Sequence, residues 1–139
     1  MSVIVIQRIQ TVYLFLAVLL TTGTFFTPLF DRLIEDPAAW IFSAYMAASV
    51  FAMGLTAWSI FRFADRDAQV STVNKAIVFQ TITVGVGVAV FFTLGPIRMD
   101  EFGEFFAVGM LVLALILQVL GRAAILKDEK LVKSMDRIR

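Results

Sequence analysis

Charged residues are missing from four long stretches of the chain and are concentrated between and after these stretches. The stretches are residues 9–30, 38–61, 76–97 and 105–121. A helix needs about 20 residues to cross roughly 30 Å of hydrocarbon, so the first three stretches are long enough. The fourth has 17 residues, but Arg122 follows it directly and can reach the interface with its long side chain. The pattern therefore predicts four transmembrane helices.

Two further features favour helices over other membrane structures. The stretches lack the period-two alternation of barrel strands, and lipid does not tolerate unpaired backbone. Trp40 and Trp58 lie near the two ends of the second stretch, so each indole falls near one membrane interface, where such rings prefer to lie. We expect an all-α membrane protein in which residues 1–121 form a four-transmembrane-helix bundle and residues 122–139 form a tail.

Basic residues are distributed unevenly between the two sides of this predicted bundle. Only Arg32 and Arg98 fall on the side of the loops at residues 31–37 and 98–104, where acidic residues dominate. The positive-inside rule then places both termini in the cytoplasm. The first stretch is too long for a signal peptide and its residues 21–24 (TTGT) lack an A-x-A-like site, so we expect it to be retained. The basic residues on the side of the termini are Arg8, Arg62, Arg66, Lys75, Arg122, Lys127, Lys130, Lys133, Arg137 and Arg139.

Composition agrees with a membrane location and narrows the chemistry. Of the 139 residues, 60% are hydrophobic and 17% are charged, against roughly 45–50% and about 25% in soluble proteins. The chain contains no Cys and no His. The commonest metal ligands, the usual haem ligand, nucleophilic thiols and the most easily titrated side chain are therefore missing. We expect a non-catalytic protein with no cofactor and no metal site.

Residues 83–87 read TVGVG and match four of five positions of the carbonyl filter in potassium channels. A filter needs extended backbone in a loop that re-enters between two spans. A re-entrant loop here would leave three spans and place basic residues on the wrong side. Small residues that repeat every four positions favour helix packing instead, and we expect two such stripes to pack as an antiparallel pair. The stripes are Thr81, Gly85 and Ala89 in the third span and Ala44, Ala48, Ala52 and Thr56 in the second.

Candidates for binding chemistry are few within and beside the spans. Gln80 and Gln118 are the strongest polar groups inside them. Such groups commonly bond a neighbouring helix, with an average contribution of about 0.6 kcal/mol; the alternative is contact with a substrate or a quinone. Arg32 and Arg98 lie among carboxylates in the two loops. If these loops meet, they form an acidic mouth for a cation, whereas exposed loop charges commonly pair weakly or are solvated.

The tail, RAAILKDEKLVKSMDRIR at residues 122–139, continues the fourth span. At 100° per residue its apolar side chains fall on one side and most charges fall opposite, which predicts an amphipathic helix. We expect this helix to lie on the anionic inner leaflet or to dock on a protein partner. Nucleic-acid binding is not expected, because acidic residues interrupt the basic run. The predicted docking residues are Leu131, Val132, Met135, Ile138, Lys127, Lys130, Lys133 and Arg137.

The two ends of the chain together resemble a known family. The start, IQRIQTVYLFLA at residues 6–17, and the end, KDEKLVKSMDRIR at residues 127–139, are similar to the signature ends of a family of small bacterial four-span membrane proteins. That family is classed only as a domain of unknown function. Its members begin almost at the Ile-Gln-Arg step, whereas this chain has residues 2–5 before the motif. The resemblance implies an inner-membrane location and the four-span topology, but no activity.

Uncharged spans, small-residue stripes and an organised tail lead to one functional expectation. We expect an accessory or scaffold subunit of a bacterial inner-membrane complex, in contact with lipids and with a membrane-protein partner or further copies of itself. The alternative is a small transporter or channel that acts as a homo-oligomer, because four spans without interior charge make a poor conduit alone.

Overall fold

The structure is a computed structural model, and it describes residues 2–35, 39–62, 64–93 and 102–138, with the side chains of residues 9–34, 39–62, 64–92 and 102–135. Every regular element in these ranges is a helix, as predicted. The four long helices are α1 (Ser2–Gly23), α3 (Ala39–Phe61), α4 (Arg66–Thr93) and α5 (Phe102–Ile138). Between α1 and α3 the chain forms a 3-10 turn, η1 (Thr24–Phe26), and a short helix, α2 (Pro28–Glu35).

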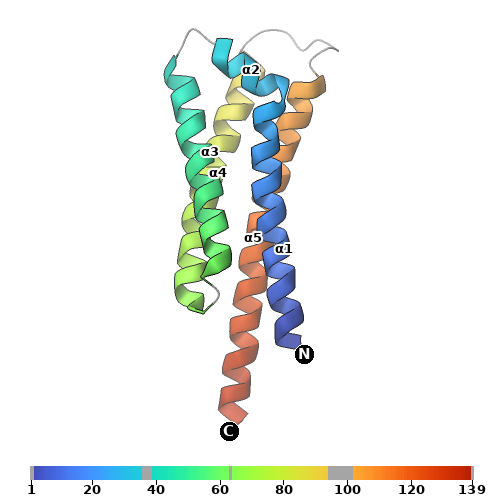
Figure 1. Cartoon of the computed structure of the whole chain (residues 1–139), viewed down its shortest axis with the longest axis vertical. Helices are drawn as coiled ribbons and strands as arrows, with labels where there is room; N and C mark the ends of the chain where they lie inside the picture. The colour runs from blue at the N-terminus through green and yellow to red at the C-terminus, as the bar shows by residue number, and fades with distance from the viewer. Residues whose placement is uncertain (1, 36–38, 63, 94–101, 139) are drawn as a thin grey trace.

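The long helices form an antiparallel bundle (Figure 1). Helix α1 packs mainly on α5 and α3 packs mainly on α4, while α4 with α5 and α1 with α3 close the ring. Consequently α1 lies diagonally across the bundle from α4, and α3 lies diagonally across from α5. Helix α1 begins and α5 ends at one end, here named the terminal end, and α2 lies across the other, here named the α2 end (Figure 1).

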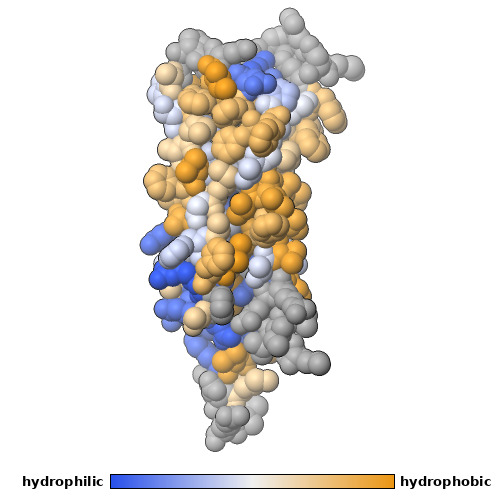
Figure 2. Space-filling model, viewed as in Figure 1, coloured by the Kyte–Doolittle hydropathy of each residue, from blue (hydrophilic) through white to orange (hydrophobic). Residues whose placement is uncertain are grey.

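All four long helices are long and apolar enough to cross a membrane. Only 28–33% of each apolar window is buried inside the bundle, so most of the span surface faces outward. Figure 2 shows this hydrophobic surface around the middle of the molecule, with hydrophilic residues gathered towards the terminal end. Trp40 and Trp58 are both exposed near opposite ends of α3. The four predicted spans are therefore confirmed by length and composition.

The first span ends earlier than predicted, because a proline stands beside its end. Pro28 has no backbone N–H and cannot continue α1, but its fixed φ suits the first position of a new helix. Helix α1 therefore ends at Gly23, and Pro28 begins α2 within the stretch predicted as span and loop. Leu29 and Leu33 lie four residues apart on α2 and are both fully buried. This short helix closes the α2 end of the bundle.

Helix α4 begins at Arg66, well before the predicted start of the third span. Asp65 caps it, because its carboxylate accepts a hydrogen bond from the backbone N–H of Ala68 at 3.2 Å. Val73 is buried and Val70 packs beside it, so this polar segment still has an apolar inner face. Helix α5 likewise runs through the predicted fourth span and tail without a break.

The predicted pairing of the two small-residue stripes is wrong for α4. On α3 the stripe does face inward, since Ala48, Ala52 and Thr56 are buried and Ala44 is half-buried. On α4, however, Gly85 faces outward, and a Cβ built there meets nothing within 4 Å. The same outward face carries the other two stripe residues of α4, Thr81 and Ala89.

A different face of α4 turns inward instead. A Cβ built on Gly87 would stand 3.0 Å from Cδ1 of Leu111 and 3.7 Å from Cδ2 of Leu29. Gly87 is therefore the glycine that allows close approach. Residues 83–87 are helical within α4, so their carbonyl groups bond along the helix and do not form an extended filter.

Gly87→Leu and Gly85→Leu are a matched pair of substitutions on this helix. We expect Gly87→Leu to lower stability by about 1–3 kcal/mol through overpacking, because Leu111 occupies the space. Gly85→Leu should leave the midpoint of thermal unfolding in detergent unchanged, because its side chain enters the open surface. Equal losses in the two variants would contradict this orientation of α4.

Candidate functional site

A belt of polar side chains crosses the middle of the bundle. The Thr21 hydroxyl donates to the Gln80 side-chain oxygen at 3.3 Å and joins α1 to α4. The Gln118 amide nitrogen donates to the Thr56 hydroxyl at 2.9 Å and joins α5 to α3. Gln80 also donates to the backbone oxygen of Leu111 at 3.3 Å. Both glutamines therefore have the interhelical role predicted for them, and the bonds to Thr21 and to Thr56 link helices that lie diagonally opposite.

Two apolar clusters bound this belt. The cluster towards the terminal end, here named the Leu14 cluster, consists of the buried Leu14, Val73 and Ile125. At the α2 end the Thr24 and Tyr45 hydroxyls share a hydrogen bond of 2.9 Å beside the second cluster. Along α3 the polar groups continue past the Leu14 cluster, because the Gln69 amide nitrogen donates to the backbone oxygen of Ser59 at 3.0 Å and the Ser59 hydroxyl donates to the backbone oxygen of Thr56 at 2.6 Å. The second cluster contains Leu29, Leu33, Tyr45, Val90, Ala107 and Leu111.

An ion pair fastens the α2 end. Arg32 of α2 lies 2.6 Å from Glu104 in the first turn of α5, and both side chains are mostly buried. A carboxylate at a helix N-terminus is further stabilised by the helix dipole. The two predicted loops, residues 31–37 and 98–104, therefore meet at this pair. Of the other residues of the predicted acidic mouth, Asp31 is exposed, whereas the side chain of Glu35 and residues 36 and 98–101 lie outside the described residues.

A second ion pair fastens the terminal end. Arg66 at the start of α4 lies 3.1 Å from Asp128 of α5, whose side chain is only 2% exposed, whereas the Arg66 side chain is 24% exposed. Removing a carboxylate from water is costly unless a cation compensates it. Asp128 belongs to the predicted tail, so this pair attaches the first part of the tail to the bundle.

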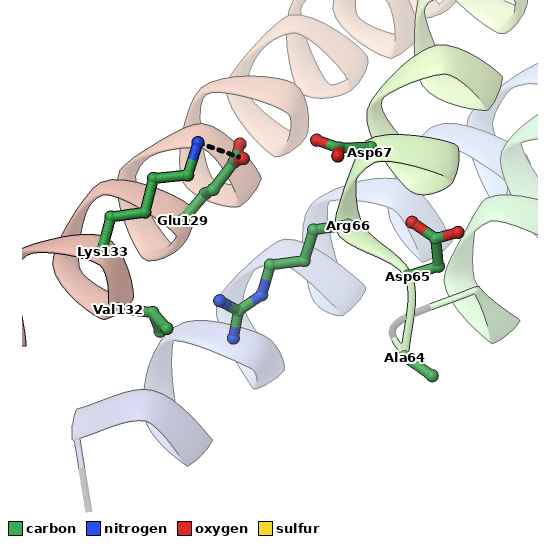
Figure 3. Close-up of a pocket in the computed structure, with 7 residues that line it drawn as sticks. All are labelled: Ala64, Asp65, Arg66, Asp67, Glu129, Val132 and Lys133. Atoms are coloured by element: carbon green, nitrogen blue, oxygen red, sulfur yellow. Dashed lines mark ion pairs between the residues drawn. The ribbon is translucent and has the colours of Figure 1, made fainter. Parts of the chain in front are cut away.

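An open groove of about 640 Å³ lies beside this pair, between the start of α4 and the end of α5 (Figure 3). In Figure 3, Asp67 points across the groove towards α5, and Arg66 extends from α4 towards Val132. Lys133 and Glu129 form an ion pair of 3.0 Å along α5. The lining is strongly charged, with a slight acidic excess, and consists of Ala64, Asp65, Arg66, Asp67, Glu129, Val132 and Lys133.

The predicted apolar side of the tail is divided between two environments. Ile125 is buried in the Leu14 cluster, and Val132 lines the groove. Leu131 and Met135 are 42% and 59% exposed. The predicted basic residues Lys127, Lys130 and Lys133 are exposed as well, and the side chains of Arg137 and Ile138 lie outside the described residues.

Gln10, Gln69 and Asp128 are buried polar residues that are not among the predicted site residues. The sequence does contain a signal for two of them. Gln69 shares a helical face with Val73 and Gln80, because spacings of four and seven residues bring side chains to the same side. Asp128 likewise follows Ile125 by three residues on the inner face of α5, although its partner Arg66 is remote in sequence.

Comparison with protein families gives one match over nearly the whole chain. The model of a family described as Domain of unknown function (DUF4293) matches residues 6–45 and 36–138. The chain belongs to this family. The DUF4293 match includes the IQRIQTVY start and almost all of the charged end, the two motifs that carry the resemblance. No curated protein and no solved structure matches the chain.

The described residues of this DUF4293 protein offer surfaces for contact with other molecules. Among the described residues, no group of three His, Cys, Asp or Glu side chains is placed to hold a metal ion. At the terminal end, two ion pairs engage Arg66, Asp128, Glu129 and Lys133, and the polar belt is engaged in hydrogen bonds. The features that remain open to other molecules are the groove and the exposed side of the tail.

Substitutions in the Arg66–Asp128 pair should have unequal effects in this DUF4293 protein. Arg66→Ala leaves a buried carboxylate without its cation and should cost about 3 kcal/mol. Asp128→Asn leaves a guanidinium that can still reach water, and should cost about 1 kcal/mol. Thermal unfolding in detergent measures both. A larger loss for Asp128→Asn would contradict the burial assigned to the pair.

Proposed function

We propose that the protein is a non-catalytic accessory or scaffold subunit of a bacterial inner-membrane complex. The carrying observation is that α5 is one helix from the membrane span to Ile138 and leaves Leu131 and Met135 exposed beyond the predicted fourth span at residues 105–121. Exposed apolar side chains outside the membrane favour contact with another protein. The neighbouring Lys127 and Lys130 give this surface a basic border.

The ion pair of α5 supports a protein partner over a flat position on the lipid surface. Ile125 and Asp128 are buried against the other helices, so the helix cannot fold down onto the membrane at these positions without breaking the Arg66–Asp128 pair. The tail then extends away from the membrane and presents its exposed side to the surroundings. We propose that both termini lie in the cytoplasm, as the distribution of basic residues favours.

The alternative proposal is a small transporter or channel that acts as a homo-oligomer. The buried polar belt of Gln80, Gln118 and their threonine partners favours it. The apolar cluster at the α2 end closes the row of polar groups in the single chain, so a conduit would have to form between copies. Flux of cations or small solutes into liposomes that contain the pure protein tests this alternative, and an impermeable vesicle would eliminate it.

Purification from native membranes in mild detergent tests the accessory role. We expect a defined second membrane protein to co-purify with the unaltered chain and to be lost with the double variant Leu131→Ser, Met135→Ser. Ser134→Ala, an exposed control on the same turn of α5, should retain that partner. Thermal unfolding of the double variant should match that of the parent, because neither side chain is in the core.

Two results would argue against an accessory role. One is a chain that migrates alone from native membranes. The other is a partner that binds the double variant and the parent equally well, which would place the contact elsewhere.

A further inference from the structure

Four buried side-chain atoms have no hydrogen-bond partner among the described residues, and all four are oxygens. They are the amide oxygens of Gln10, Gln69 and Gln118 and one carboxylate oxygen, Oδ1, of Asp128. Each of these residues is at least 97% buried. Buried polar atoms in proteins are nearly always bonded, to protein or to ordered water. The oxygens therefore need donors that the chain itself does not supply.

Three of these residues lie close together in height along the bundle. Gly121 of α5 packs directly on Leu14 of α1. Gln10 precedes Leu14 by four residues, and Ile125 follows Gly121 by four. Because α1 and α5 are antiparallel, Gln10 and Ile125 lie at the same level of the bundle. Gln69 is one turn before Val73, which contacts Ile125 in the Leu14 cluster. Gln69 and Gln10 therefore form a layer at the level of Ile125, at the terminal edge of that cluster.

The Arg66–Asp128 pair occupies the next layer outward. Asp128 is three residues beyond Ile125 on α5, and Arg66 is three residues before Gln69 on α4. The pair joins these two positions at 3.1 Å through the other carboxylate oxygen, Oδ2. Within the layer, the Gln69 amide nitrogen is satisfied, because it donates to the backbone oxygen of Ser59 at 3.0 Å. Only acceptor atoms are thus left over.

Charge decides which donor fits. The guanidinium of Arg66 already neutralises Asp128, so a further cation would leave a net positive charge in a buried site, which is strongly disfavoured. Water is neutral, is small, and can donate two hydrogen bonds to two acceptors. A buried water commonly makes about three hydrogen bonds, and this layer offers several oxygens. Water is therefore the ligand that matches the layer.

A route for water is present beside the layer. The groove in Figure 3 is open and charged, and Arg66 is one of its lining residues. The same Arg66 side chain is partly exposed and reaches the buried Asp128. The ion pair thus stands between the groove and the buried oxygens. On the far side, Leu14, Val73 and Ile125 offer apolar atoms, while Ser59 and Thr56 of α3 continue a path of buried polar groups from Gln69 to Gln118.

We propose that water molecules occupy the layer of Gln10, Gln69 and Asp128 and that they exchange through the groove. The protein then contains a hydrated pocket that reaches from the terminal end to Gln10 and Gln69. This site is independent of the proposed accessory role, because it concerns the isolated chain.

Hydrogen exchange at the glutamine side chains tests the proposal on the unaltered protein. The chain has five glutamines, so a side-chain amide spectrum of glutamine-labelled protein in lipid nanodiscs is simple, and Gln→Glu variants assign it. We expect the amides of Gln10 and Gln69 to exchange with water at least about tenfold faster than that of Gln80. Gln80 is the matched control, because its oxygen and nitrogen both have protein partners. Exchange at Gln10 and Gln69 as slow as at Gln80 would overturn the proposal.

Discussion

Lipid tails are as apolar as leucine, so burial of apolar side chains between helices brings little free energy in a membrane. Close packing and hydrogen bonds inside the core must hold the four helices together instead. The core meets this requirement with small residues, since Ala17, Ala52 and Ala76 are fully buried. It also uses polar bonds between diagonal helices, from Thr21 to Gln80 and from Gln118 to Thr56. Nearly every other feature of the fold follows from this way of joining helices.

Helix α5 is where these interactions converge. It makes an ion pair at each end of the bundle, with Arg32 at the α2 end and with Arg66 at the terminal end. Between them, Gln118 reaches across to α3. A helix that is fastened at three heights has little freedom to tilt, so the tail that continues it has a defined direction. This direction is what suits the exposed Leu131 and Met135 to contact with another protein.

Prediction from sequence succeeded for the spans, where the free energy of moving a long uncharged stretch out of water is large. It failed for helix ends and buried polar residues, whose positions depend on single contacts. Long uncharged stretches can lie only in lipid or in a large core, so the four helices followed directly. Helix ends were less well predicted, because they depend on individual residues such as Pro28, which stops one helix and starts the next, and Asp65, which caps α4. The buried Gln69 and Asp128 were missed, because polar residues near a span end are usually exposed.

The sequence by itself determined that the chain forms four membrane-length helices, because hydropathy separates lipid from water. It also determined family membership, through the motifs at its two ends. Only the tertiary structure decided which face of each helix turns inward. Gly85 and Gly87 look equivalent in sequence, yet one faces the surroundings and the other receives Leu111. Lipid and protein core are both apolar, so hydropathy cannot distinguish these faces, and the choice rests on the fit between side chains from distant parts of the chain.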